Sequence, residues 1–251
     1  MRATTPLVEE SMNRAVWITG AGSGIGAAMA RAFATAGHSV ALTGRNRDSL
    51  EETVASLPHD ARCLVVPGDV TDRGGMADAA QQVADWGDGL QVLCNNAGLN
   101  IPKRRWAELD WPSWDRVIDV NITGALNVIA ACLPIMRTQK SGLMIHTGSW
   151  AGRHHSQTGG VVYGASKHAL SELSASLNDE EGANGIRSTV LCPAEVATPL
   201  LARRPGFDPA QMGAVIQPDD IAQTALYVTK MSPNVVIEEI VLSSARDKTA
   251  E

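Results

Sequence analysis

The segment Thr19-Gly20-Ala21-Gly22-Ser23-Gly24-Ile25-Gly26 decides the interpretation of the whole chain. It follows the short apolar run Ala15–Thr19 and opens a stretch of helical character that extends to about residue 36. Four glycines within seven residues let a backbone approach a pyrophosphate, which then meets the free N–H groups of a helix N-terminus. Because a strand precedes the glycines and a helix follows them, we interpret the segment as a dinucleotide-binding turn. A tight turn without a ligand is the alternative.

Short apolar runs alternate with helical stretches along the rest of the chain. Expected strands cover 15–19, 39–43, 62–66, 90–95, 142–147, 186–191 and 235–242, and expected helices cover 24–36, 47–57, 72–86, 112–138, 158–181 and 218–230. Several runs are rich in Val, Ile and Leu without strict alternation, which is typical of parallel strands covered on both faces. The order predicts an α/β fold, a Rossmann-type doubly wound parallel sheet of about seven strands with helices on both faces. No linker or repeat divides the chain, so we expect one domain over 14–245, with tails at 1–13 and 246–251.

Composition and charge exclude several classes of protein. The net charge of −6 argues against nucleic acid or an anionic membrane surface as the main partner. No uninterrupted apolar run is long enough to span a bilayer, and residues 1–14 lack the apolar core of a signal peptide, so we expect a cytoplasmic protein. The cysteines and histidines have no metal-binding spacing, so we predict no metal site.

The residues after the second expected strand bear on the choice of cofactor. A site that prefers NAD has an acidic residue about 20 positions beyond the glycine loop, where it binds the ribose hydroxyls. Here the chain reads Gly44-Arg45-Asn46-Arg47, without an acid. Arg45 can bind a 2′-phosphate by donating a charge-assisted hydrogen bond to it. NADP(H) is therefore favoured and NAD(H) remains possible, with a solvated arginine as the alternative interpretation.

Tyr163 and Lys167 stand four positions apart in a stretch with a helical apolar stripe. Residues with this spacing share one face of a helix. A free phenol is a poor base at neutral pH, and a nearby ammonium group stabilises the phenolate. We therefore expect Lys167 to lower the pKa of Tyr163 and make it a general acid/base.

The order of these and other motifs resembles the short-chain dehydrogenase/reductase family over about residues 14–243. The matching segments are the glycine loop, Asp69-Val70, Asn95-Asn96-Ala97-Gly98, Asp119-Val120-Asn121, Gly148-Ser149 and Tyr163-xxx-Lys167. The resemblance implies hydride transfer between a nicotinamide cofactor and a carbonyl/alcohol substrate.

The resemblance also implies a role for each matching residue. Tyr163 would be the general acid/base, Ser149 would hydrogen-bond the substrate oxygen, and Lys167 would also hold the nicotinamide ribose. Asn121 would anchor a water that relays protons; a buried Asn at a helix bulge is the alternative for it, and a turn cap is the alternative for Ser149. The implied cofactor-binding residues are Gly20, Ser23, Gly24, Ile25, Gly26, Arg45, Asp69, Val70, Asn96, Ala97, Gly98, Tyr163, Lys167, Pro193, Val196 and Thr198.

Two departures from the family pattern lie near the expected substrate pocket. Ala194-Glu195 follows Pro193 where the family usually has Pro-Gly, which places an acid near the nicotinamide end. The segment between Ser149 and Tyr163 is longer than usual by one residue, so we expect 153–160 to rim the pocket. Segment 198–217 has poor periodicity and is predicted to be a substrate lid, with an ordinary surface excursion as the alternative.

The substrate itself is not readable from the sequence. Three basic clusters suggest a polar or anionic substrate, although such clusters are more often solvated surface; they are Lys103-Arg104-Arg105-Trp106, Arg153-His154-His155 and Arg203-Arg204. An alternative function is a regulatory protein that binds NADP(H) without turnover. A lyase or dehalogenase on the same fold is disfavoured because Lys167 is present. Helices 112–138 and 158–181 carry apolar residues beyond one stripe, so we expect a homo-oligomer, a tetramer or a dimer.

Overall fold

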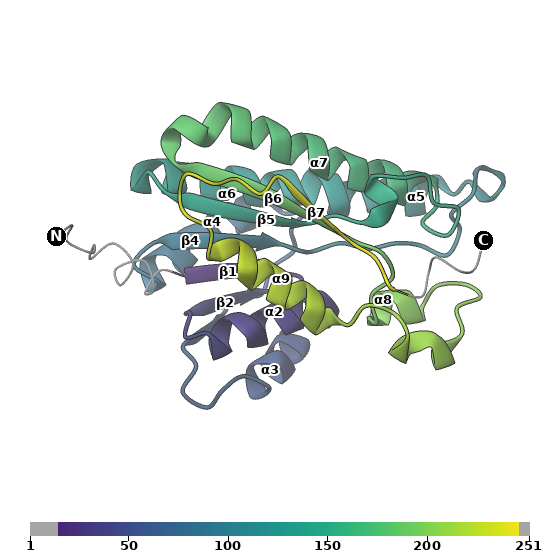
Figure 1. Ribbon diagram of the computed structural model, residues 1–251, viewed down its shortest axis with the longest axis horizontal. Coiled ribbons are helices and arrows are strands. Elements are labelled where there is room, and N and C mark those ends of the chain that lie inside the picture. The colour runs from purple at the N-terminus through teal and green to yellow at the C-terminus, as the bar shows by residue number, and fades with distance from the viewer. Residues whose placement is uncertain (1–14, 246–251) are drawn as a thin grey trace.

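Seven parallel strands form one sheet in the order β3-β2-β1-β4-β5-β6-β7 (Figure 1). The computed structural model describes residues 15–245, so the predicted tails at 1–13 and 246–251 lie outside the described residues. The strands are β1 Ala15–Thr19, β2 Val40–Thr43, β3 Cys63–Val65, β4 Leu90–Asn95, β5 Gly142–Thr147, β6 Ile186–Pro193 and β7 Glu239–Leu242. The predicted sheet is confirmed, including its parallel pairing and its number of strands.

The last strand is shorter than the sequence predicts. The apolar run suggested a strand over 235–242, but β7 begins only at Glu239. Residues before it form a turn in which the Val235 N–H donates to the Ser232 carbonyl oxygen at 2.9 Å. The Arg187 side chain donates to the Val235 carbonyl oxygen at 2.8 Å. This carbonyl therefore bonds to a side chain and not to the backbone of a neighbouring strand.

Helices cover both faces of the sheet, as predicted (Figure 1). They are α2 Gly24–Thr35, α3 Arg47–Ala55, α4 Arg73–Trp86, α5 Trp111–Ile118, α6 Gly124–Gln139, α7 Val161–Glu181, α8 Pro199–Ala202 and α9 Pro218–Thr229. Neighbouring residues of a strand point to opposite faces. Val16 and Ile18 of β1 therefore pack in the core beneath α2 and α9, whereas Trp17 packs in the core beneath α4, α6 and α7.

The predicted helix 112–138 contains a break in its hydrogen-bonding pattern. Residues Asp119–Thr123 form a π-helical turn between α5 and α6, in which the Gly124 N–H donates to the Asp119 carbonyl oxygen. By length and composition the whole stretch Trp111–Gln139 can cross a membrane, but core helices pass the same test. Val128 and Met136 of this stretch are buried in the core formed with the sheet.

The carboxyl ends of all seven strands lie at one edge of the sheet, where ligands of open α/β sheets bind. The predicted lid, 198–217, lies beyond β6 and is less irregular than expected. It contains α8 and the 3-10 turn Pro209–Gly213, and Val196 pairs with Ile216 across its base. Proline at the start of each helical turn and side-chain caps from Thr198 and Asp208 explain this local order.

Candidate active site

A cavity of about 1370 Å³ opens at the carboxyl edge of the sheet. Its walls come from the glycine loop, the ends of β2, β4, β5 and β6, the first turns of α7, and the start of the predicted lid. All predicted site residues line it except Gly26 and Asn121. Those that line it are Gly20, Ser23, Gly24, Ile25, Arg45, Asp69, Val70, Asn96, Ala97, Gly98, Ser149, Tyr163, Lys167, Pro193, Val196 and Thr198.

The glycine loop forms one end of this cavity and has the shape that a pyrophosphate requires. Gly20 has φ +65°, and a Cβ there would lie 2.9 Å from the Cα of Ala97, so only glycine fits. Ser23 begins α2 without a side-chain cap, and the first turn contains no acidic residue. The N–H groups and positive end of this helix are therefore available to an anion, and the residues fit a dinucleotide.

Gly26 has a packing role that the sequence did not distinguish from cofactor contact. It is buried in α2, and a Cβ there would lie 2.3 Å from the Gly20 carbonyl oxygen. The missing side chain therefore lets the helix approach the loop closely. Asn96 also joins elements of the protein, because its Nδ2 donates to the Thr19 carbonyl oxygen at 3.1 Å and its Oδ1 accepts from Thr147 at 3.0 Å.

Arg45 lies at the end of β2, where the sequence analysis expects the adenosine ribose. It is exposed and lines the cavity, and the described residues provide it with no ion-pair partner. Arg47, the other arginine of this segment, is paired with Glu51 at 3.3 Å. Asn46 caps α3 through its Oδ1, which accepts from the Asp48 N–H at 2.8 Å. Within residues 15–245, Arg45 therefore has no ion-pair partner, whereas Arg47 has one.

Ser149, Tyr163 and Lys167 come together on the opposite wall. Ser149 follows β5 and caps the 3-10 turn Trp150–Gly152, its Oγ accepting from the Ala151 N–H at 3.1 Å. It also forms a side-chain hydrogen bond with Tyr163. Its position is therefore compatible with both interpretations from the sequence, a hydrogen bond to the substrate oxygen and a turn cap. Tyr163 and Lys167 lie on one face of α7, and the Lys167 Nζ lies 5.8 Å from the Tyr163 ring centroid.

The expectation that Lys167 lowers the pKa of Tyr163 stays a prediction, and the structure shows which other groups act on this phenol. Burial raises the pKa of Tyr163, and the Ser149 hydrogen bond and the charge of Arg104 only partly oppose this. The Lys167 ammonium instead donates to the Thr147 carbonyl oxygen at 2.7 Å. Burial also lowers the pKa of Lys167 to about 8. Sequence reasoning missed Arg104 as the cation that acts on Tyr163; its only signal was membership of a basic cluster.

Asn121 lies in the π-helical turn beneath the cavity and is buried. Its Nδ2 donates to the Leu99 carbonyl oxygen and to the Ser166 hydroxyl, both at 3.0 Å, and its Oδ1 accepts from the Leu99 N–H at 2.8 Å. These bonds join the loop after β4 to α7. They agree with the alternative interpretation, a buried Asn at a helix bulge.

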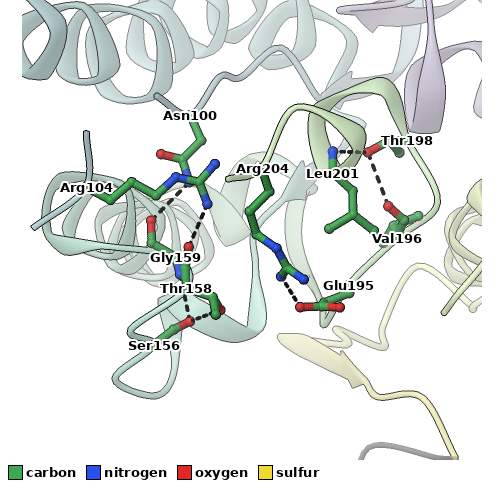
Figure 2. Close-up of polar contacts among 10 residues, drawn as sticks. All are labelled: Asn100, Arg104, Ser156, Thr158, Gly159, Glu195, Val196, Thr198, Leu201 and Arg204. Atoms are coloured by element: carbon green, nitrogen blue, oxygen red, sulfur yellow. Dashed lines mark hydrogen bonds and ion pairs between the residues drawn. The ribbon is translucent and has the colours of Figure 1, made fainter. Parts of the chain in front are cut away.

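The remaining wall of the cavity is basic. Arg104, Arg203 and Arg204 line it, whereas the other members of the three basic clusters do not; those are Lys103, Arg105, Trp106, Arg153, His154 and His155. Glu195, the acid at the departure from the family pattern, pairs with Arg204 of the lid (Figure 2). Ser156, Thr158 and Gly159 also line the cavity, so of the segment 153–160 only the part from Ser156 to Gly159 reaches it, and Arg153, His154 and His155 do not. Over residues 15–245 no group of three or more His, Cys, Asp or Glu side chains is arranged to hold a metal ion.

Known proteins match this fold and these motifs over most of the chain. Residues 14–206 match the family model described as short chain dehydrogenase. An uncharacterised oxidoreductase of Staphylococcus epidermidis is 32% identical over 225 residues, which cover 90% of this chain and 94% of the relative.

Two similar solved structures contain NADP or an NADP derivative. An alcohol dehydrogenase from the archaeon Thermococcus sibiricus, complexed with 5-hydroxy-NADP, has 28% identity and a TM-score of 0.82, covering 92% of this chain and 97% of its own. The closed form of a serine dehydrogenase complexed with NADP+ has 26% identity and a TM-score of 0.85, covering 94% and 97%. The chain therefore belongs to the short-chain dehydrogenase/reductase family of NAD(P)-dependent oxidoreductases.

Proposed function

We propose that this chain transfers a hydride between NADP(H) and a carbonyl/alcohol substrate, with Tyr163 as the general acid/base. One observation carries the proposal: Ser149, Tyr163 and Lys167 line the same cavity as the glycine loop at the N-terminus of α2. A dinucleotide bound along this cavity would have its pyrophosphate at the loop.

The cofactor would be held by residues from several strand ends. Gly20 and Gly24 belong to the pyrophosphate end, Arg45 and Asp69 to the adenosine end, and Thr198 to the nicotinamide end. When bound, the cofactor supplies or accepts the hydride. The preference for NADP(H) rests on Arg45, which is exposed and unpaired among the described residues. The two structural neighbours named above were solved with NADP+ and with an NADP derivative, which supports the same choice.

The side chains of the protein handle the proton. Since burial raises the pKa of Tyr163, its phenol stays protonated at neutral pH and can donate its proton to the carbonyl oxygen during reduction. Ser149, hydrogen-bonded to Tyr163, would donate to the same oxygen and share its developing charge. Lys167 would hold the ribose hydroxyls of the cofactor. Lys167 would return a proton to Tyr163 less readily as the pH rises through about 8, the pKa of its ammonium group, because the ammonium is then increasingly deprotonated.

A combined binding and turnover experiment tests the proposal. NADPH and NADH are titrated by fluorescence, and a panel of ketones, aldehydes, oxo acids and the corresponding alcohols is then assayed in both directions. We expect NADPH binding and turnover of at least one member of the panel. NADPH binding with no turnover across the panel would instead support the alternative, a regulatory protein that senses the cofactor.

A further inference from the structure

Two arginines share one end of the cavity beside Tyr163. Arg104 comes from the loop after β4, and Arg204 comes from the predicted lid after α8. Both are partly buried. Figure 2 shows Arg104 beside Thr158 and Gly159, and Arg204 between these residues and Glu195. Two like charges repel each other in a partly buried site, so a bound anion would stabilise this pair of arginines.

Arg104 is held rigidly by the backbone on both sides. Its Nε donates to the Ile101 carbonyl oxygen at 2.5 Å, and its Nη1 donates to the Thr158 carbonyl oxygen at 2.6 Å (Figure 2 shows the latter). Asn100 fixes the same two loops together, because its Nδ2 donates to the Gly159 carbonyl oxygen at 3.0 Å. The guanidinium group carries five N–H donors. Most of them therefore remain available, in an orientation set before any ligand binds.

The positive charge of Arg104 is not neutralised by the protein. Arg204 is paired with Glu195 and stacks on Phe207, with its Cζ 5.0 Å from the ring centroid. Over residues 15–245, no ion pair joins the Arg104 guanidinium to a carboxylate within 4 Å. Burial and the charge of Arg204 lower the pKa of Arg104, whereas Tyr163 raises it, so all three groups interact. Arg104, Arg204 and Glu195 together carry one net positive charge, and Arg203 and Lys167 of the same cavity add to it.

On the basis of the function proposed above, we infer that the substrate is a small oxo acid or hydroxy acid whose carboxylate binds Arg104. The carboxylate would supply the missing negative charge and accept two parallel N–H bonds from the guanidinium. Arg104 and Tyr163 line the same cavity and interact electrostatically, so a carboxylate bound to Arg104 would share this cavity with the reacting carbonyl.

The reaction leaves that carboxylate unchanged. In reduction, the carbonyl carbon of the oxo acid accepts a hydride from the reduced nicotinamide cofactor, and the carbonyl oxygen accepts a proton from Tyr163. The products are the hydroxy acid and the oxidised cofactor. Arg104 is thus a substrate-binding residue that sets specificity, and it exchanges no proton or electron.

Matched acids and neutral esters test the inference in the whole enzyme. The substrates are lactate, 3-hydroxybutyrate and 4-hydroxybutyrate with NADP+, each compared with its methyl ester. We expect higher kcat/KM for at least one acid than for its ester. Arg104→Gln should lower kcat/KM for that acid by about 10- to 100-fold more than for its ester, mainly through KM. The ester reports any effect that loss of the Arg104 charge has on Tyr163. Lys103→Gln removes a charge from the same loop, but Lys103 is exposed and outside the cavity, so it should change neither value.

A second variant distinguishes loss of substrate binding from misfolding, because we expect it to bind the acid more tightly and a misfolded protein would not. Glu195→Gln removes the negative charge that holds Arg204, so it should lower KM for the acid by about 3- to 10-fold. Binding of butyrate to the NADPH complex, measured by calorimetry with butyramide as the neutral control, should weaken in Arg104→Gln and strengthen in Glu195→Gln.

The outcomes separate this inference from the proposed function. Turnover of esters or neutral ketones with no preference for any acid would overturn the inference and leave the hydride-transfer function in place. Equal losses for acid and ester in Arg104→Gln would also overturn it, since that result indicates a structural role. Absence of turnover with every substrate, despite NADPH binding, would overturn the proposed function and the inference with it.

Discussion

Replacing Arg45 with alanine should remove most of the preference for NADPH over NADH. Arg45 follows Gly44, which offers no side chain to fill the space beside it, and no acid occupies the end of β2. The other nearby arginine, Arg47, is paired with Glu51 at 3.3 Å. Any charge-assisted bond to a 2′-phosphate therefore depends on Arg45.

The exposure of Arg45 sets the size of the effect. A hydrogen bond to a charged group contributes about 1.5–3 kcal/mol when it is shielded from water. Solvent and salt reduce this for an exposed side chain, so we expect about 1–2 kcal/mol, which corresponds to about 5- to 30-fold in affinity. Because the screening length falls from about 10 Å at 0.1 M salt to about 3 Å at 1 M, the preference should also shrink as salt is added.

The assay compares kcat/KM and fluorescence-derived Kd for NADPH and NADH in the wild-type protein, in Arg45→Ala and in Arg47→Ala. The wild-type protein should favour NADPH by the factor above, Arg45→Ala should bind both cofactors nearly equally, and Arg47→Ala should resemble the wild type. Equal values for both cofactors in the wild-type protein would refute this reasoning. So would a preference in Arg45→Ala that is as large as in the wild type.

Three further predictions concern other parts of the molecule. Lys167→Ala should reduce both turnover and cofactor affinity in the same titrations, and unchanged NADPH affinity would show that Lys167 does not hold the ribose. Arg137 and Asn184 donate to Glu181 and lower its pKa from 4.5 to about 2. These bonds therefore stabilise the folded protein above pH 4.5, and this stabilisation is lost as the pH falls towards 2. Glu181→Gln should unfold at lower urea concentration than the wild type at pH 7, with the difference shrinking below pH 4.5 and closing only as the pH approaches 2, and a difference independent of pH would contradict the assignment. Ile118 and Leu126 remain 40% and 42% exposed on α5 and α6; we expect them to be covered in a homo-oligomer that Leu126→Asp dissociates, and a wild-type monomer by light scattering at micromolar concentration would exclude this.

The parts of the fold that depend on local chemistry were predictable. The glycine loop, its preceding strand and its following helix are determined by residues next to one another, and β1 covers Ala15–Thr19 as expected. The last strand was less predictable because its start depends on Arg187, which lies 48 residues from Val235 in the sequence. An apolar run gives no information about such a distant hydrogen bond.

The interruption of helix 112–138 also depends on distant partners. Asn121 bonds to Leu99 and Ser166, which are 22 and 45 residues away in the sequence. The residues of the turn themselves, Asp119–Thr123, carry no pattern that distinguishes a π-helical turn from an ordinary one. The amide chemistry of Asn121 was recognised from its motif, but its partners were not.

The electrostatics of the candidate site were the least predictable part. The spacing of Tyr163 and Lys167 correctly placed both on one face of α7, yet the direction of the Lys167 ammonium is set by the Thr147 carbonyl oxygen, 20 residues away. Three adjacent basic residues, Lys103-Arg104-Arg105, look alike in the sequence, and only Arg104 lines the cavity. Its anchoring to Thr158, 54 residues away, distinguishes it from its neighbours.

The central claim, that Tyr163 is the acid/base for hydride transfer in this cavity, is tested most directly by single-turnover oxidation of bound NADPH in Tyr163→Phe. The chain contains two tyrosines, and Tyr227 on α9 is 54% exposed and outside the cavity, so Tyr227→Phe is the matched control. We predict that Tyr163→Phe slows the single-turnover rate by about 10²- to 10⁴-fold with NADPH affinity nearly unchanged, while Tyr227→Phe reacts like the wild type. A Tyr163→Phe protein that oxidises NADPH at the wild-type rate would contradict the account.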